Sequence, residues 1–369
     1  MAVIRGGYWR SSEANKFPPE KILTDYFTHL FYATVAIDPL SYLIQPNHID
    51  QMWMRRFTSV ISKNASVRCI LSIGEDTETG RTAFSNMIST PDGRKKFIED
   101  SIKKARENGF HGLDLYWKYP ATQNEFDMPN LWLLFKEWRH SLNEESSRTG
   151  NPRLFLSTIA YFAPKFFPPN DIKAYPFKSI KDNVDFVNLV CYDYIGRGGQ
   201  FLVTDQHALL YDKQVKMSTH YGISSWIDDA GFPEEKLVMG LPLYGRTWKL
   251  AAPHQNWIGV HTMPGSGYGH MDYSDILNFN RDHRAIVVDD KTVSTYSYAG
   301  QDWIGYDSKF SIKGKVQYAK DHALGGYFFW ALGMDKDHEL PKQGSFTYTF
   351  INNALLIQIS QTFLTTRIV

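Results

Sequence analysis

Eight short apolar runs, separated by segments with helical spacing, predict an α/β fold in which parallel strands close into a (β/α)8 barrel. Most of the runs are almost continuously apolar, as expected of parallel strands that are buried on both faces. A chain of 369 residues is long enough for one such barrel with insertions. The predicted strands cover residues 3–9, 27–35, 67–74, 112–117, 154–162, 184–192, 236–243 and 324–331.

The segments between the strands carry helix signals. Thr90 predicts a helix N-cap and Pro91 the first helical position. Apolar residues then recur on one helical face at positions 97, 98, 102 and 105. Gly109 ends this helix, because glycine readily takes the left-handed conformation found after a helix. The same spacing predicts a further helix around residues 131–142.

The connection after the seventh strand is too long for one helix and two short loops, which are the usual parts of such a connection. It contains short β-like pieces at residues 285–288 and 292–296. We therefore expect a small α+β insertion over residues 249–307, inside a barrel domain that covers residues 1–343. The tail, residues 344–369, is expected to be poorly ordered or to form a short helix.

Composition limits the classes of partner and cofactor. A net charge of +1 gives no electrostatic reason to bind nucleic acid or an anionic membrane. No run of about 20 apolar residues is present, so no membrane span is expected. The aromatic content of 15% suits a cleft that stacks on flat sugar faces. We expect no metal and no cofactor, and we expect Cys69 and Cys191, both inside apolar runs, to be buried thiols.

The N-terminal residues show no signal-peptide pattern, because no long apolar stretch follows Met1. One sequon, Asn64-Ala65-Ser66, follows a predicted helix and hints at secretion. We therefore expect an extracellular protein.

The fourth predicted strand carries a row of polar side chains. Asp114, Tyr116 and Lys118 lie on one face at two-residue spacing. Tyr119 and Pro120 end the strand, since proline cannot donate to the ladder. An acid, a phenol and an ammonium in one row indicate a functional site rather than packing alone.

The stretch from His111 to Lys118 resembles the signature of glycoside hydrolase family 18, the chitinase family, which reads roughly D-G-x-D-x-D-x-E. Asp114 matches the second Asp, Tyr116 replaces the third, and Lys118 replaces the catalytic Glu. His111 stands where most members have the first Asp, although plant class V members also carry His there. The resemblance covers most of residues 3–335, and it implies the same barrel with an α+β insertion.

The resemblance implies further site residues at the strand ends. Tyr192 and Asp193 match a pair that contacts the sugar acetamido group, and Trp330 matches the floor of the central sugar subsite. Arg246 lies in a stretch close to the seventh-strand pattern, and Glu75 replaces a glycine of the third-strand motif. The candidate ligand-binding residues are Tyr8, Glu75, Tyr116, Lys118, Tyr192, Asp193, Tyr244, Arg246 and Trp330.

Family 18 hydrolysis is substrate-assisted, an exception to the scheme with two carboxylates. The Glu gives a proton to the leaving oxygen and then activates water. A lysine with an ordinary pKa of about 10.4 stays cationic and cannot take both roles. The resemblance therefore implies a catalytically degenerate member that binds N-acetylglucosamine oligomers without cleaving them, like chitinase-related lectins or receptor ectodomains.

Two alternatives stay open. The chain is an enzyme with relocated acids, for which Glu75 and Asp193 are the candidates, or a barrel scaffold that acts as a storage protein or a glycosidase inhibitor. We expect a monomer with chitin oligosaccharides as ligands, and no protein partner is identified. We also expect Asp193 to be the carboxylate nearest the Lys118 ammonium and Glu75 the second nearest, because an unpaired buried charge is costly.

Overall fold

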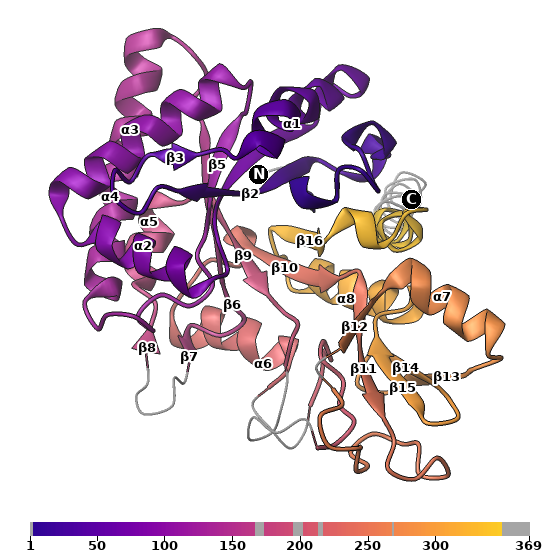
Figure 1. Cartoon of the computed structure of the whole chain (residues 1–369). Coiled ribbons are helices and arrows are strands. Elements are labelled where there is room, and N and C mark those ends of the chain that lie inside the picture. The colour runs from indigo at the N-terminus through magenta and orange to yellow at the C-terminus, as the bar shows by residue number, and fades with distance from the viewer. Residues whose placement is uncertain (1–2, 167–172, 195–201, 213–216, 268, 349–369) are drawn as a thin grey trace, which may run out of the picture.

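The computed structural model describes residues 3–166, 173–194, 202–212, 217–267 and 269–348. In these residues, parallel strands form a closed barrel in which each pairs with the strand before it, and the last pairs with the first. The predicted (β/α)8 barrel is confirmed (Figure 1). Its strands are β1 (Ile4–Arg10), β2 (His29–Ile37), β4 (Arg68–Gly74), β5 (Gly112–Tyr116), β6 (Phe155–Tyr161), β9 (Phe186–Val190), β10 (Leu237–Pro242) and β16 (Gly326–Trp330).

Helices surround these strands, and two small β elements decorate them (Figure 1). The helices are α1 (His48–Thr58), α2 (Glu78–Ile88), α3 (Pro91–Glu107), α4 (Asp127–Thr149), α5 (Phe177–Asn183), α6 (Thr219–Ser224) and α8 (Lys309–Asp321). The short strand β3 (Ile44–Gln45) pairs antiparallel with β2, and β7 (Lys165–Phe166) pairs with β8 (Lys173–Ala174). No helix among the described residues is both long and apolar enough to cross a bilayer.

The local helix signals are confirmed. Helix α3 begins at Pro91, and the Thr90 hydroxyl accepts a hydrogen bond of 3.1 Å from the backbone N–H of Gly93. That bond satisfies a donor that the first turn of a helix otherwise leaves unpaired. Gly109 follows the helix with φ of +75°, the conformation expected of a residue that closes a helix.

The insertion is a five-stranded antiparallel sheet with one helix. Its elements are β11 (Tyr244–Lys249), β12 (Gly269–Asp272), α7 (Tyr273–Asp282), β13 (Ile286–Asp290), β14 (Ser294–Ala299) and β15 (Asp302–Tyr306). The sheet begins at Tyr244, before the expected boundary at residue 249, because β11 pairs with β12 and β15 rather than with a barrel strand. Figure 1 shows it as an orange body beside the barrel.

The tail prediction falls mostly outside the described residues. Residues 344–348 continue a helix that begins at residue 339. Residues 349–369 are not among those described, so the expectation for them stays a prediction. The two cysteines, Cys69 and Cys191, are both buried and free, as expected.

The first residue of β2, His29, is a buried titratable group in an aromatic setting. Its ring meets the edges of Phe155 and Phe186 at 5.7 and 5.6 Å. Burial, followed by the nearby charges of Arg68 and His111, lowers the pKa of His29 to about 4. The folded chain therefore takes up this proton only at about pH 4 and below.

We predict that His29 weakens the fold in acid. Between about pH 6.5 and 4 the unfolded chain binds the proton and the folded chain does not, so stability falls as the pH falls. In urea unfolding at pH 7 and pH 4.5, His29→Asn should lose less stability on acidification than the unsubstituted chain. The exposed His254→Asn is the control and should keep the original slope. Equal slopes for both variants would contradict this account.

Candidate functional site

Two aromatic rings are stacked at the carboxyl ends of the barrel strands. Tyr116 is the last residue of β5, and Trp330 is the last residue of β16. Their ring centroids lie 5.3 Å apart with an interplanar angle of 26°. Tyr116 is buried, whereas Trp330 is partly exposed. The phenol ring of Tyr116 therefore covers one face of Trp330.

Strand register brings these rings together. Trp330 pairs with Tyr8 on β1 and with Pro242 on β10. The Tyr8 ring lies 5.4 Å from Trp330 and 6.3 Å from Tyr116. Inward-facing side chains from different strands fill the interior of an eight-stranded barrel. The stacked pair is thus the upper layer of the barrel core.

Asp114 lies below this layer and is fully buried. Its carboxylate accepts hydrogen bonds from Tyr8 Oη (3.0 Å), Ser72 Oγ (2.7 Å) and Ser157 Oγ (2.7 Å). Asn188 Nδ2 in turn donates to Tyr8 Oη at 2.8 Å. Burial raises the pKa of Asp114, and the three hydroxyl donors only partly oppose this rise. Through these hydrogen bonds, Asp114 links strands β1, β4, β5 and β6 inside the barrel.

Asp193 follows β9 and pairs with Arg246 of the insertion sheet. The Arg246 Nε and Nη2 atoms donate to the same carboxylate oxygen at 3.0 and 2.6 Å. Burial alone would raise the pKa of Asp193, but His207 and Arg246 hold it below its usual range. Asp193 is therefore ionised and already neutralised by a cation.

His207 belongs to this cluster although the sequence reasoning did not select it. Its Nδ1 lies 3.6 Å from the nearer Asp193 oxygen, just beyond hydrogen-bond length. Among the described residues neither ring nitrogen has a hydrogen-bond partner, and the ring centroid lies 5.1 Å from that of Tyr244. The apolar run that follows His207 was a signal of burial, but no motif marked it as part of the site.

A small cavity of about 140 Å³ opens beside the exposed edge of Trp330. It is lined by Arg10, Tyr244, Arg246, His270, Trp330 and Met334. Three predicted binding residues, Tyr244, Arg246 and Trp330, thus surround one opening. The Arg246 guanidinium lies 5.7 Å from the ring centre of Tyr244, which places a cation over an aromatic face.

Comparison with known families identifies this architecture. Residues 5–335 match the family described as Glycosyl hydrolases family 18. The chain belongs to this family. Its barrel fold matches that of solved family members, and within the family the chain is similar to plant class V chitinases.

Curated and solved relatives support the assignment. A class V chitinase of Lotus japonicus is 40% identical over 346 residues, which span 93% of this chain and 85% of the relative. A class V chitinase from Nicotiana tobaccum, solved in complex with NAG4, is 34% identical with a TM-score of 0.88, and the match covers 94% of this chain and 99% of that one. A chitinase-like agglutinin from Robinia pseudoacacia is 36% identical with a TM-score of 0.86 over the same shares.

The predicted partner of Lys118 is wrong. The Lys118 Nζ atom lies 3.3 Å from Asp76 Oδ2, in the loop after β4. Asp193 is instead neutralised by Arg246. Strand β5 of this family 18 barrel ends at Tyr116, so Lys118 lies beyond it, and strand alternation no longer fixes its direction.

The environment keeps Lys118 cationic. Burial alone would lower the pKa of its ammonium. Tyr116 and Tyr119, followed by the carboxylates of Asp76 and Asp193, instead raise the pKa above its ordinary value. Because the Asp76 side chain is 42% exposed and water screens the pair, this ion pair orients the ammonium but contributes little stability.

Three further predicted site residues, Tyr8, Tyr192 and Glu75, do not line the cavity. Tyr8 is fully buried and Tyr192 is 5% exposed, so neither offers a free ring face. Glu75 lies against the start of α2. His111 accepts a hydrogen bond of 3.2 Å from the Cys69 N–H, and it is the satisfied polar group that was expected. Across the described ranges, no His, Cys, Asp and Glu side chains gather in a way that could hold a metal ion.

Proposed function

We propose that this family 18 chain binds N-acetylglucosamine oligosaccharides of the chitin type without hydrolysing them. The observation that carries the proposal is the pair Tyr116 and Lys118 at the positions of two catalytic acids in the family signature. Tyr116 is stacked on Trp330, and Lys118 is held as an ammonium beside Asp76.

Neither residue supplies the missing chemistry. The leaving oxygen needs a proton, and the attacking water must later lose one, so the acid must cycle between two protonation states. Lys118 stays charged, and a fixed positive charge beside a cationic transition state opposes the reaction. Burial raises the pKa of Tyr116, so its phenol stays neutral and does not supply the carboxylate of the missing Asp.

The geometry also weakens the proposal of relocated acids. Asp193 is ionised and bonded to Arg246, so it is not an acid that can give a proton. Glu75 lies against α2 rather than at the cavity beside Trp330. Asp114 directs its oxygens toward three hydroxyls below the stacked pair.

A sugar can still bind at the cavity beside Trp330, which we call the barrel mouth. Tyr244, Arg246 and Trp330 line the opening, and they combine aromatic surface with a hydrogen-bond donor. Tyr116 fills the space below, so a sugar rests above its ring and is not drawn deeper. That position favours an undistorted ring, which suits recognition better than cleavage. Two relatives support this proposal. One is a class V chitinase solved in complex with NAG4, and the other is a chitinase-like agglutinin.

We predict that Trp330→Ala weakens binding of chitotetraose by about tenfold, because one aromatic platform contributes on the order of 1 kcal/mol. Calorimetric titration measures the change. Trp132→Ala is the matched control, since Trp132 is a partly exposed tryptophan on α4 that does not line the cavity. Equal affinity of the two variants would rule out the mouth as the site.

One observation favours a second candidate, a scaffold without a sugar ligand. The stacking of Tyr116 on Trp330 leaves a cavity of only about 140 Å³, smaller than a typical ligand pocket. If this reading is right, the unsubstituted chain shows no affinity for chitotetraose at millimolar concentration, whereas Tyr116→Gly gains it. Affinity in the unsubstituted chain would favour the lectin-like reading.

We also propose that the protein acts outside the cell as a monomer. Its sequon lies at the surface, where Ser66 Oγ donates a hydrogen bond of 2.6 Å to Asn64 Oδ1. Mass spectrometry of protein expressed through a secretory pathway tests this proposal, since Asn64 should carry a glycan there.

A further inference from the structure

The last strand of the inserted sheet, β13, has one open edge. The strand order of this sheet is β12-β11-β15-β14-β13, so β13 pairs with β14 on one side and, among the described residues, with no strand on the other. Figure 1 shows β13 at the margin of the orange body, on the side away from the barrel. An open edge presents a row of backbone N–H and C=O groups to which another strand can bind.

The edge lacks the features that usually block such binding, which are a proline, a lysine or a β-bulge. Strand β13 reads Ile-Val-Val-Asp-Asp, and β-branched residues such as the first three favour strands. Its residues pair one for one with those of β14, without a bulge. The side chains of Ile286 and Val287 are 54% and 48% exposed. The edge is therefore accessible and apolar.

The backbone groups that face the open edge belong to alternate residues. The Asp290 carbonyl accepts a hydrogen bond of 2.9 Å from the Val293 N–H, in the turn that leads into β14. Asp290 therefore directs its backbone groups toward β14. Along an antiparallel strand, residues that exchange hydrogen bonds with the neighbouring strand alternate with residues that face away from it. Val287 and Asp289 thus direct their N–H and C=O groups outward.

A second copy of the chain fits this edge in an antiparallel register centred on Val287. Two edges bond only where outward-facing residues lie opposite outward-facing residues, and Val287 meets this condition by facing its own copy across a two-fold axis. The opposite pairs in this register are Val287 with Val287, Ile286 with Val288, Ala285 with Asp289, and Arg284 with Asp290.

The charges in this register are complementary. Arg284 is exposed just before β13, and Asp290 is the last residue of the strand. The Asp290 carboxylate accepts hydrogen bonds of 2.9 and 2.7 Å from the N–H and hydroxyl of Thr292, which are neutral donors. Each Arg284 then faces Asp290 of the second copy. A shift of two residues places Asp290 opposite Ile286, or Arg284 opposite Val288, and loses both ion pairs.

We propose that β13 pairs with β13 of a second copy, so that two inserted sheets join into one continuous sheet. One pair of short strands makes a small contact, compared with about 1,600 Å² in a standard interface. The dimer is therefore reversible and forms at high concentration, and the monomer proposed above is the dilute form. Strand β13 contributes no residue to the barrel mouth, so this proposal does not rest on sugar binding.

Sedimentation velocity at about 10 µM and about 500 µM tests the proposal, because a reversible dimer grows with concentration. We expect the dimer fraction of the unsubstituted chain to rise between these concentrations. Val287→Pro removes an outward N–H but no bond to β14, so it should stay folded and monomeric. Val287→Thr is the matched control, since it keeps the N–H and a β-branched side chain, and it should form the dimer.

Charge reversal tests the register. Arg284→Glu should weaken the dimer about tenfold, because it replaces two ion pairs with two like-charge contacts. Arg281→Glu makes the same charge change at an exposed residue of α7 outside the paired segment, and should leave the dimer unchanged. Trp330→Ala at the barrel mouth should also leave it unchanged.

A monomer at the highest concentration would overturn the proposal and leave the edge to a strand of a different protein. Dimer formation by Val287→Pro equal to that of Val287→Thr would also overturn it, because the contact would then lie elsewhere. Equal losses in Arg284→Glu and Arg281→Glu would contradict the register. Circular dichroism spectra check that each variant is folded.

Discussion

We expect the double variant Tyr116→Asp/Lys118→Glu to hydrolyse a fluorogenic chitotriose substrate, and Lys118→Glu alone to stay nearly inactive. A positioned acid–base is typically worth about 100- to 10,000-fold in rate. The single variant restores that group but leaves the phenol of Tyr116 stacked on Trp330. The sugar then cannot enter deeply enough to present its acetamido oxygen to the anomeric carbon.

The surroundings of Lys118 add a second reason. A glutamate at this position would face Asp76, which now accepts the ammonium at 3.3 Å. Like charges at this distance raise the pKa of one of the two carboxyl groups. That change alters the protonation of the acid but does not replace the Asp that is missing at position 116. Opening the space at Tyr116 is therefore required as well.

The matched control is Tyr116→Asn/Lys118→Gln, which has the same side-chain sizes without the carboxyl groups. It should open the site and bind chitotetraose but show no turnover. Hydrolysis by the unsubstituted chain, or a rate for Lys118→Glu equal to that of the double variant, would refute the proposed loss of catalysis.

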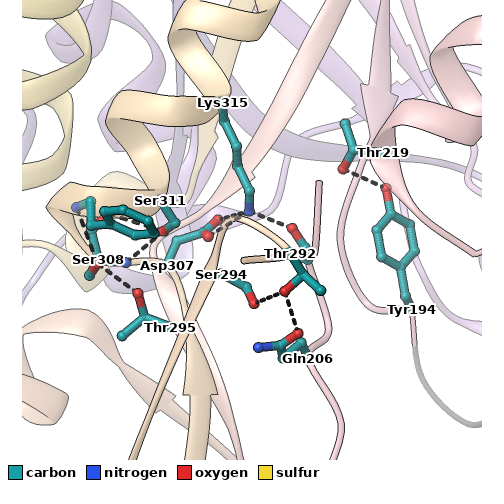
Figure 2. A network of polar contacts seen from close by, with 12 residues as sticks. Tyr194, Gln206, Thr219, Thr292, Ser294, Thr295, Asp307, Ser308, Ser311 and Lys315 are labelled. Carbon is teal, nitrogen blue, oxygen red and sulfur yellow. Dashed lines mark hydrogen bonds and ion pairs between the residues drawn. The ribbon is translucent and has the colours of Figure 1, made fainter. Parts of the chain in front are cut away.

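We expect Asp307→Ala to destabilise the fold by about 3–5 kcal/mol, because it leaves the buried ammonium of Lys315 without its carboxylate partner. Lys315 of α8 is 1% exposed, and its Nζ lies 2.5 and 2.6 Å from the two oxygens of Asp307, which is fully buried. The same Nζ donates to the backbone carbonyl of Ala208. Figure 2 shows the Lys315–Asp307 pair beside the Gln206–Thr292 contact.

Burial, opposed by Asp307, lowers the pKa of Lys315, so losing that carboxylate would lower the pKa further. The double variant Asp307→Ala/Lys315→Met removes both charges and should lose less stability than Asp307→Ala alone. Urea unfolding measures all the variants. A loss below about 1 kcal/mol for Asp307→Ala would show that the ammonium finds water or another acceptor.

Local signals in the sequence determined the barrel and its layers. Near-continuous apolar runs predicted each strand, because a parallel strand in a barrel is buried on both faces. Thr90 and Gly109 marked the ends of α3 through backbone chemistry that depends only on neighbouring residues. Two-residue alternation predicted that Asp114 and Tyr116 lie on one face of their strand, and both are buried inside the barrel.

The tertiary structure alone decided which side chains meet. Tyr116 and Trp330 come from strands far apart in the chain, and their stacking depends on barrel register and side-chain rotamers, which no local pattern encodes. His207 joined the site because the segment between β9 and α6 that carries it lies against Asp193.

The ion pair of Lys118 shows most clearly what the sequence determined and what only the fold decided. The sequence determined that it carries a charge at the barrel mouth in need of a carboxylate. It could not determine that Asp76 would supply it, because Arg246 from the inserted sheet had already neutralised Asp193. Charge pairing inside a protein is a competition among all the groups within reach, and only the closed fold sets which groups those are.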